Sequence, residues 1–232
     1  MNIQGLQKLT LLDYPGKTAC TIFTGGCNLR CPFCHNAVLV LCPNAEEGHS
    51  EEEIIELLRK RRGILDGIAI TGGEPLLQKD ILSFMKRLKD EGVSVKLDTN
   101  GAYPDKLREA IDKGLVDYVA MDIKNSKEKY ALTTGIQNID IAPFEESVKI
   151  LLENKVDYEF RTTVVRELHA AEDFSRIGEW LSGCSRYYLQ SYVDSEQVLV
   201  SGFSAYSREE LLSFLEIVRP HVAHVELRGV DY

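Results

Sequence analysis

The chain has 232 residues and a formal net charge of -9 at pH 7, from 36 acidic and 27 basic side chains. This balance argues against a protein that binds nucleic acid by neutralising phosphates. No apolar run has the length of a membrane span, and the start MNIQGLQKLTLLDYPGK lacks the basic and then apolar layout of a signal peptide. We therefore expect one cytoplasmic domain over residues 1–232, with no nucleic-acid or membrane partner.

Short β-rich runs alternate with amphipathic helical patterns along the chain. Strands are predicted at 18–25, 68–71, 93–99, 116–123, 156–165, 186–192 and 224–228. Helices are predicted at 52–62, 80–92, 104–114, 144–154, 171–183 and 210–219. Capping boxes precede the first and last of these helices, with Ser50 and Glu53 in one and Ser207 and Glu210 in the other. Repeated strand, helix and strand units predict an α/β fold, a partial (β/α)6-type TIM barrel with parallel strands.

A polar or cysteine-rich cluster follows each of the first four predicted strands. Cysteines follow the first strand, TGGEP (71–75) the second, DTNG (98–101) the third and DIK (122–124) the fourth. Taken singly, the glycine-rich stretches are typical of ordinary turns. Because ligands bind at the carboxyl ends of the strands in such folds, the shared location predicts a site there.

The chain has six cysteines, which gather toward the N-terminal end: Cys20, Cys27, Cys31, Cys34, Cys42 and Cys184. Without an export signal, metal or redox chemistry is favoured over a disulfide framework. The pattern Cys27-x3-Cys31-x2-Cys34 leaves two interpretations open. One is a zinc site completed by His35 or Cys42, and the other is a 4Fe-4S cluster with one iron free to bind a substrate.

The cysteine motif resembles the CxxxCx(aromatic)C pattern of the radical S-adenosylmethionine (SAM) superfamily, with Phe33 at the aromatic position. With DYPGK (13–17), FTGGCNLRCPFCHN (23–36), TGGEP, DTNG and MDIK (121–124), the chain is similar to the activases of glycyl radical enzymes. Among these it most resembles the activating proteins of anaerobic ribonucleoside-triphosphate reductase. The resemblance covers nearly the whole chain, most strongly up to about Lys124. It implies SAM and one 4Fe-4S cluster, because only Cys42 lies between the motif and TGGEP, where further clusters would need more cysteines.

The resemblance also implies which side chains serve the cofactors. Glu74 would meet the SAM ammonium group, Lys124 the methionine carboxylate or ribose, and Val165 the adenine. Asp98, Thr99 and Asp122 would hold a monovalent cation. A salt bridge of Asp122 with Lys124 and a packing role for Val165 stay open. The metal ligands are Cys27, Cys31 and Cys34, and the cofactor-binding set is Phe33, Gly72, Gly73, Glu74, Asp98, Asn100, Asp122, Lys124, Arg161, Thr163 and Val165.

One family contact lacks its residue in this sequence. Several activases carry a ribose-binding histidine near the sixth strand, but the corresponding stretch LQSYVD (189–194) contains none. Gln190 and Tyr192 are the candidate substitutes. We expect His169, His221 and His224 to be surface or packing residues.

The implied activity is reductive cleavage of SAM to methionine and a 5'-deoxyadenosyl radical, which abstracts a hydrogen from a glycine of a partner glycyl radical enzyme. Anaerobic ribonucleotide reductase is the expected partner, with flavodoxin or ferredoxin as electron donor. The chain itself is expected to supply no catalytic residue beyond those that bind the cluster and SAM. Two alternatives stay open: a small-molecule radical SAM enzyme such as 7-carboxy-7-deazaguanine synthase, and a non-catalytic zinc-binding module.

Overall fold

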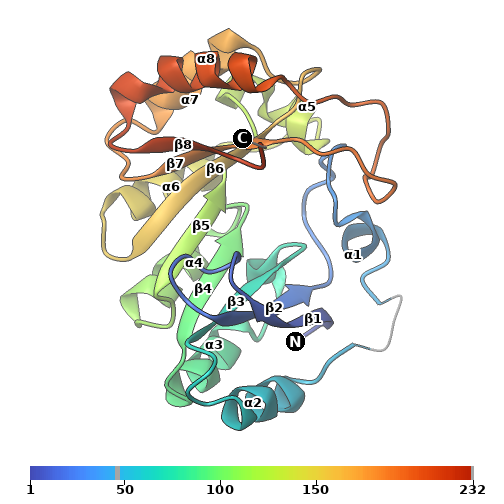
Figure 1. Ribbon diagram of the computed structural model, residues 1–232, viewed down its shortest axis with the longest axis vertical. Helices are drawn as coiled ribbons and strands as arrows, with labels where there is room; N and C mark the ends of the chain where they lie inside the picture. The colour runs from blue at the N-terminus through green and yellow to red at the C-terminus, as the bar shows by residue number, and fades with distance from the viewer. Residues whose placement is uncertain (45–47, 231–232) are drawn as a thin grey trace.

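The computed structural model describes residues 1–44 and 48–230 and contains one curved sheet of eight strands in sequential order (Figure 1). Every neighbouring pair is parallel except the first, in which β1 runs antiparallel to β2. The predicted parallel α/β fold is therefore confirmed, and β1 is an addition that the sequence did not predict. The strands are β1 (Ile3–Thr10), β2 (Ala19–Thr24), β3 (Gly67–Gly72), β4 (Ser94–Thr99), β5 (Tyr118–Asp122), β6 (Asp157–Val164), β7 (Tyr187–Ser191) and β8 (Val225–Arg228).

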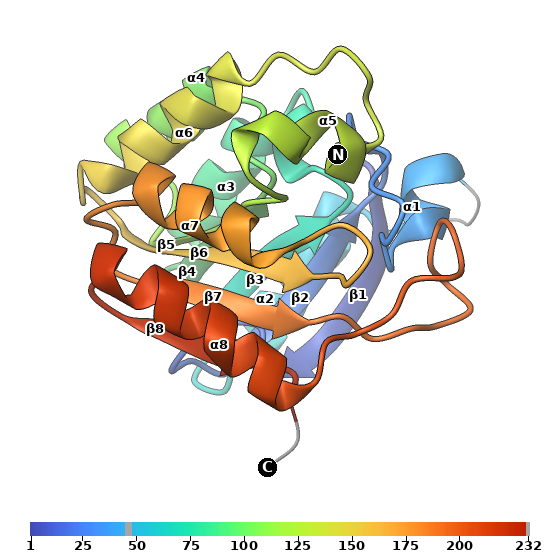
Figure 2. The same cartoon turned by 90° about the horizontal axis from the view of Figure 1, so that it is seen from above.

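The long helices cover the outer, convex face of the sheet (Figures 1 and 2). Both predicted capping boxes are present, at the start of α2 and of α8. Two short helices, α1 and α5, were not predicted. Across the described residues, the helices are all too short or too polar to span a bilayer. The helices are α1 (Ala37–Leu41), α2 (Glu51–Lys60), α3 (Ile81–Asp90), α4 (Pro104–Asp112), α5 (Tyr130–Thr134), α6 (Ala142–Leu152), α7 (Ala171–Trp180) and α8 (Arg208–Val218).

The two faces of the sheet differ in polarity, because successive side chains of a strand point to opposite faces. In β4, Val95 and Leu97 are fully buried in the main apolar core that lies under the helices. The intervening Lys96 and Asp98 point the other way and form an ion pair. Arg161 of β6 also pairs with Asp98. The inner face of the barrel is thus charged, while the outer face provides the hydrophobic stabilisation.

The DYPGK segment lies at the base of the barrel. Thr10 at the end of β1 pairs with Ala19 at the start of β2, so residues 13–17 sit at the amino ends of the parallel strands. Tyr14 is buried against Ala19 and Tyr118. The motif therefore packs the end of the barrel opposite to the cysteines, which follow the carboxyl end of β2.

Candidate active site

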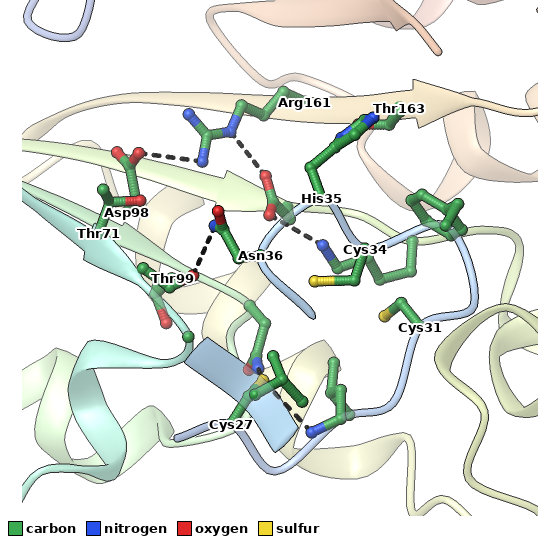
Figure 3. A pocket seen from close by; sticks show the side chains of 18 residues that line it. Cys27, Cys31, Cys34, His35, Asn36, Thr71, Asp98, Thr99, Arg161 and Thr163 are labelled. Atoms are coloured by element: carbon green, nitrogen blue, oxygen red, sulfur yellow. Dashed lines mark hydrogen bonds and ion pairs between the residues drawn. The ribbon is translucent and has the colours of Figure 1, made fainter. Parts of the chain in front are cut away.

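A pocket at the carboxyl ends of the strands gathers most of the residues predicted from the sequence (Figure 3). Glu74 and Val165 do not line this pocket. Leu29, Asn36, Val40 and Thr71 line it although the sequence analysis did not name them as site residues. Thr99, expected at the cation site, and His35, a candidate zinc ligand, line it as well. The predicted metal- and cofactor-binding residues that line it are Cys27, Cys31, Phe33, Cys34, Gly72, Gly73, Asp98, Asn100, Asp122, Lys124, Arg161 and Thr163.

The cysteine loop leaves β2 and is held on both sides by backbone contacts. The Gly26 amide donates to Leu39 O at 2.7 Å, and the Arg30 amide donates to Thr134 O at the end of α5 at 2.9 Å. The Asn36 side chain donates to Gly72 O at 3.0 Å. Figure 3 shows the cysteines of this loop around one side of the pocket, with the pair of Asp98 and Arg161 on the other side.

Gly72 and Gly73 bring β3 close to the cysteine loop. A Cβ atom on Gly73 would lie 2.0 Å from Gly26 O, and one on Gly72 would lie 2.3 Å from the Thr24 nitrogen. The Gly73 amide donates to Thr24 O at 2.8 Å. These contacts leave no room for a side chain, so both glycines have a structural role in addition to the predicted one beside a cofactor.

The Glu74 carboxylate is fully buried and points into the protein. It accepts hydrogen bonds from the Leu76 amide (3.0 Å), the Asn100 amide (2.7 Å) and the Thr99 hydroxyl (2.8 Å). Burial raises the pKa of this carboxyl to about 7, although its hydrogen bonds oppose the shift. The carboxylate therefore joins the turn after β3 to the turn after β4, and its contact with an ammonium group stays a prediction.

Charged side chains of β4, β5 and β6 form a row along the inner face. Arg161 Nε donates to Asp122 at 2.6 Å and an Arg161 terminal nitrogen lies 3.2 Å from Asp98. Lys124 Nζ donates to Asp122 at 2.9 Å, and Lys96 pairs with Asp98. Burial alone would raise the pKa of Asp122, but Arg161 and Lys124 outweigh it and hold that pKa below its ordinary value. The two carboxylates are therefore ionised at neutral pH.

His169 is a packing residue, one of the two roles expected for it from the sequence. Its ring is 3% exposed, accepts from the Val165 amide at 3.1 Å and lies 2.9 Å from Lys124 O. Since Nδ1 is the acceptor, Nε2 carries the proton that it donates to Lys124 O. His169 thus fixes the backbone of Lys124 against the end of β6. Val165 itself is fully buried in a small apolar cluster, so its contact with adenine also stays a prediction.

The candidate ribose contacts remain predictions as well. Tyr192 is 2% exposed and its ring stacks on His35 with centroids 5.6 Å apart. The Tyr192 hydroxyl donates to Asp194 at 3.0 Å. Neither Tyr192 nor Gln190 lines the pocket.

Residues 21–177, more than half of the chain, match the family description of the radical SAM superfamily. The chain belongs to this superfamily. A protein of Methanocaldococcus jannaschii that carries the provisional name glycyl-radical enzyme activating enzyme is 32% identical over 99% of this chain and 96% of its own. The 7-carboxy-7-deazaguanine synthase of Thermoplasma acidophilum is 28% identical over 73% of each chain.

The fold is that of solved radical SAM proteins. Streptococcus suis SuiB, in a crystal structure with bound S-adenosylmethionine, superposes with a TM-score of 0.69 at 14% identity, over 89% of this chain and 49% of the other. At this level of identity the likeness concerns the fold alone. It agrees with the partial TIM barrel predicted from the sequence.

Radical SAM membership implies a 4Fe-4S cluster, and the thiols of the pocket fit one. Among residues 1–44 and 48–230, no three His, Cys, Asp or Glu side chains converge closely enough to hold a single metal ion. Zinc needs its thiolates about 2.3 Å from one point, whereas a cluster spreads three cysteines over three irons. Of the two candidate fourth zinc ligands, Cys42 is exposed and lies outside the pocket lining, whereas His35 lines the pocket. Membership of the superfamily is what favours a cluster over zinc.

The thiols need deprotonation before they can bind iron. Burial raises the pKa of Cys31 to about 12, although the charge of Lys124 opposes this, and burial also raises the pKa of Cys27. Iron binding by these thiols would therefore displace their protons, with Lys124 as the nearby positive charge that favours the thiolates. Loading of the cluster is expected to be easier at higher pH.

Proposed function

We propose that the protein is a radical SAM activase, a single radical SAM core domain over residues 1–232, that installs a glycyl radical on a partner enzyme. A 4Fe-4S cluster held by Cys27, Cys31 and Cys34 would supply the electron that cleaves SAM into methionine and a 5'-deoxyadenosyl radical. This radical would take a hydrogen atom from a glycine Cα of the partner, giving 5'-deoxyadenosine and the glycyl radical. We propose anaerobic ribonucleotide reductase as the partner, and flavodoxin or ferredoxin as the donor.

The observation that carries this proposal is the placement of three thiols and a row of fixed charges in one pocket. Lys124 presents an ammonium group beside the cysteines, which suits the carboxylate of the methionine moiety. Gly72 and Gly73 line the same pocket, and the absence of their side chains lets this backbone pack against Thr24 and Gly26 beside the cysteine loop. Asn100 reaches toward the cysteine loop, where its amide donates to Asn28 Oδ1 at 2.9 Å. The chain therefore provides polar groups to orient SAM beside the thiols.

We favour activation of a glycyl radical enzyme over a small-molecule reaction because of how much of each relative's chain is similar to this one. The relative with the activating-enzyme name matches across almost the full length of both chains, whereas the 7-carboxy-7-deazaguanine synthase matches over about three quarters. The synthase activity is the second candidate. We place the reaction in an anaerobic cytoplasm, because an iron–sulfur centre with an open iron is oxygen-labile.

The test is anaerobic incubation of reconstituted protein with SAM, dithionite and purified anaerobic ribonucleotide reductase, followed by electron spin resonance. The expected result is the glycyl doublet on the reductase. Cys31→Ala should lose both the bound iron and the doublet, while Cys42→Ala, outside the pocket, should keep both. SAM cleavage with no doublet on the reductase, together with turnover of a pterin substrate, would favour the synthase. Iron-free protein that contains zinc would rule out both activities.

A further inference from the structure

Every oxygen atom of the two pocket carboxylates contacts a positively charged nitrogen. Asp98 Oδ1 contacts Lys96, and Asp98 Oδ2 lies 3.2 Å from an Arg161 terminal nitrogen. Asp122 Oδ1 accepts from Arg161 Nε at 2.6 Å, and Asp122 Oδ2 accepts from Lys124 at 2.9 Å. The result is a row of alternating charge, Lys96, Asp98, Arg161, Asp122 and Lys124, which we call the charge row. Figure 3 shows the contact between Asp98 and Arg161 in this row.

The charge row comes from strand register. Lys96 and Asp98 are two residues apart in β4 and share its inner face. Asp122 of β5 pairs in register with Arg161 of β6, which places the guanidinium beside both carboxylates. The side chain of Lys96 is 3% exposed, that of Asp98 13% and that of Arg161 16%. At such burial, attraction between opposite charges is stronger than at the surface.

Thr99, the remaining residue of the cation site inferred from the family resemblance, also has other partners. Its hydroxyl donates to Glu74 at 2.8 Å and accepts from the Gly101 amide at 3.1 Å. Thr99 is 3% exposed. Its hydroxyl is thus engaged by Glu74 and by the turn, so the third expected oxygen ligand also has partners within the protein.

We propose that Lys96 and Arg161 are built-in cations that take the place of a free monovalent cation beside Asp98 and Asp122. The charge row contains three cations and two carboxylates, so its net charge is already positive and repels a further cation. Hard cations bind through several oxygen ligands, and the carboxylate oxygens are already engaged. Lys96 and Arg161 are positioning residues: Lys96 holds Asp98, Arg161 holds both Asp98 and Asp122, and Asp122 holds Lys124 in the pocket. The proposal goes beyond the proposed activity and does not depend on the partner.

The first test compares the melting temperature of the protein without cluster in sodium, potassium and tetramethylammonium chloride at equal ionic strength. Tetramethylammonium is too large to enter a site between two carboxylates. The expected result for the wild type is the same melting temperature in all three salts. Selective stabilisation of the wild type by sodium or potassium would overturn the proposal.

The second test removes a built-in cation. Arg161→Met leaves two partly buried carboxylates, with side chains 13% and 30% exposed, short of a partner and should lower the melting temperature by about 10 °C. Sodium or potassium, but not tetramethylammonium, should restore part of that loss, and sodium NMR should show line broadening that potassium competes away. Arg166→Met is the matched control. It has the same change in net charge but removes an exposed ion pair with Glu210, and should show neither effect.

A folded Arg161→Met variant without a selective response to sodium or potassium would contradict the proposal. If Arg161→Met does not fold, Lys96→Met removes the other built-in cation that contacts Asp98. The same two measurements, melting temperature in the three salts and sodium NMR, apply to it. The wild-type comparison in the three salts decides the proposal even if neither variant folds. All of these measurements use protein without cluster, so they are independent of whether the activase function is correct.

Discussion

The close approach of β3 to the cysteine loop makes a quantitative prediction for Gly73→Ala. The added Cβ would lie 2.0 Å from Gly26 O, while real Cβ atoms stay at least 3.0 Å from such neighbours, so the two segments must separate by about 1 Å. That movement weakens two hydrogen bonds of 2.8 Å, from the Gly73 amide to Thr24 O and from the Glu74 amide to Gly26 O.

The expected cost follows from these contacts. Two lost backbone hydrogen bonds cost about 1 kcal/mol each, and overpacking adds about 1–3 kcal/mol. Gly73→Ala should therefore lower the free energy of unfolding by about 3–5 kcal/mol. Gly73 has no unusual φ angle, so the effect reports the collision and not backbone strain.

Gly92→Ala is the matched control. Gly92 lies in the turn after α3 with a φ of +80°, and an added Cβ would have no atom within 4 Å. Gly92→Ala should therefore lower the free energy of unfolding only through left-handed backbone strain, by about 1 kcal/mol. Urea unfolding of both variants under reducing, anaerobic conditions gives the two values. A Gly73→Ala variant no less stable than Gly92→Ala would refute the close approach of β3 to the cysteine loop.

Three further predictions concern buried titratable groups near the pocket. Burial raises the pKa of Glu74 from an ordinary 4.5 to about 7, so the folded chain binds the carboxyl proton more tightly than the unfolded chain does. The stability that Glu74 contributes therefore falls as the pH rises from 4.5 to about 7. Glu74→Gln should lose this pH dependence in urea titrations, and an unchanged profile would contradict it. Iodoacetamide at about pH 8 should modify the exposed Cys42 before Cys31, whose pKa is about 12, as measured by peptide mass spectrometry. His169→Ala leaves Lys124 O without its ring partner and should lower the free energy of unfolding in urea by about 2 kcal/mol. An unchanged free energy would contradict the role of His169 in fixing the Lys124 backbone.

The sequence predicted the strands and helices whose apolar pattern is strong. β3 and β4 are short runs of buried apolar residues between turns, and the predicted ranges 68–71 and 93–99 overlap both strands. The sequence analysis missed β1 because β1 is an edge strand with only one neighbouring strand, β2, and is therefore less buried. Leu9 near its end, for example, is 47% exposed. An edge strand with this composition has no clear period of two.

The charged inner face of the barrel required the structure. The sequence shows Lys96 and Asp98 on one face of a strand, but not which residue lies opposite. The structure pairs Asp122 with Arg161, which are far apart in the chain. It also places Glu159 of β6 against Arg228 of β8, with contacts of 2.6 and 2.8 Å. Long-range pairs of this kind depend on sheet order and register, which a single sequence does not report.

The TGGEP motif shows that a motif recognised in a sequence does not by itself reveal what its residues contact in the structure. From the sequence, its glycines and Glu74 were expected to face a cofactor. In the structure, Gly73 packs against the cysteine loop and Glu74 joins the motif to Asn100, whose side chain lies near Cys27. The motif thus sets the distance between the thiols and β4. Substitutions there should change iron binding through the position of the loop, and a loss of SAM affinity with normal iron content would instead indicate direct contact with the cofactor.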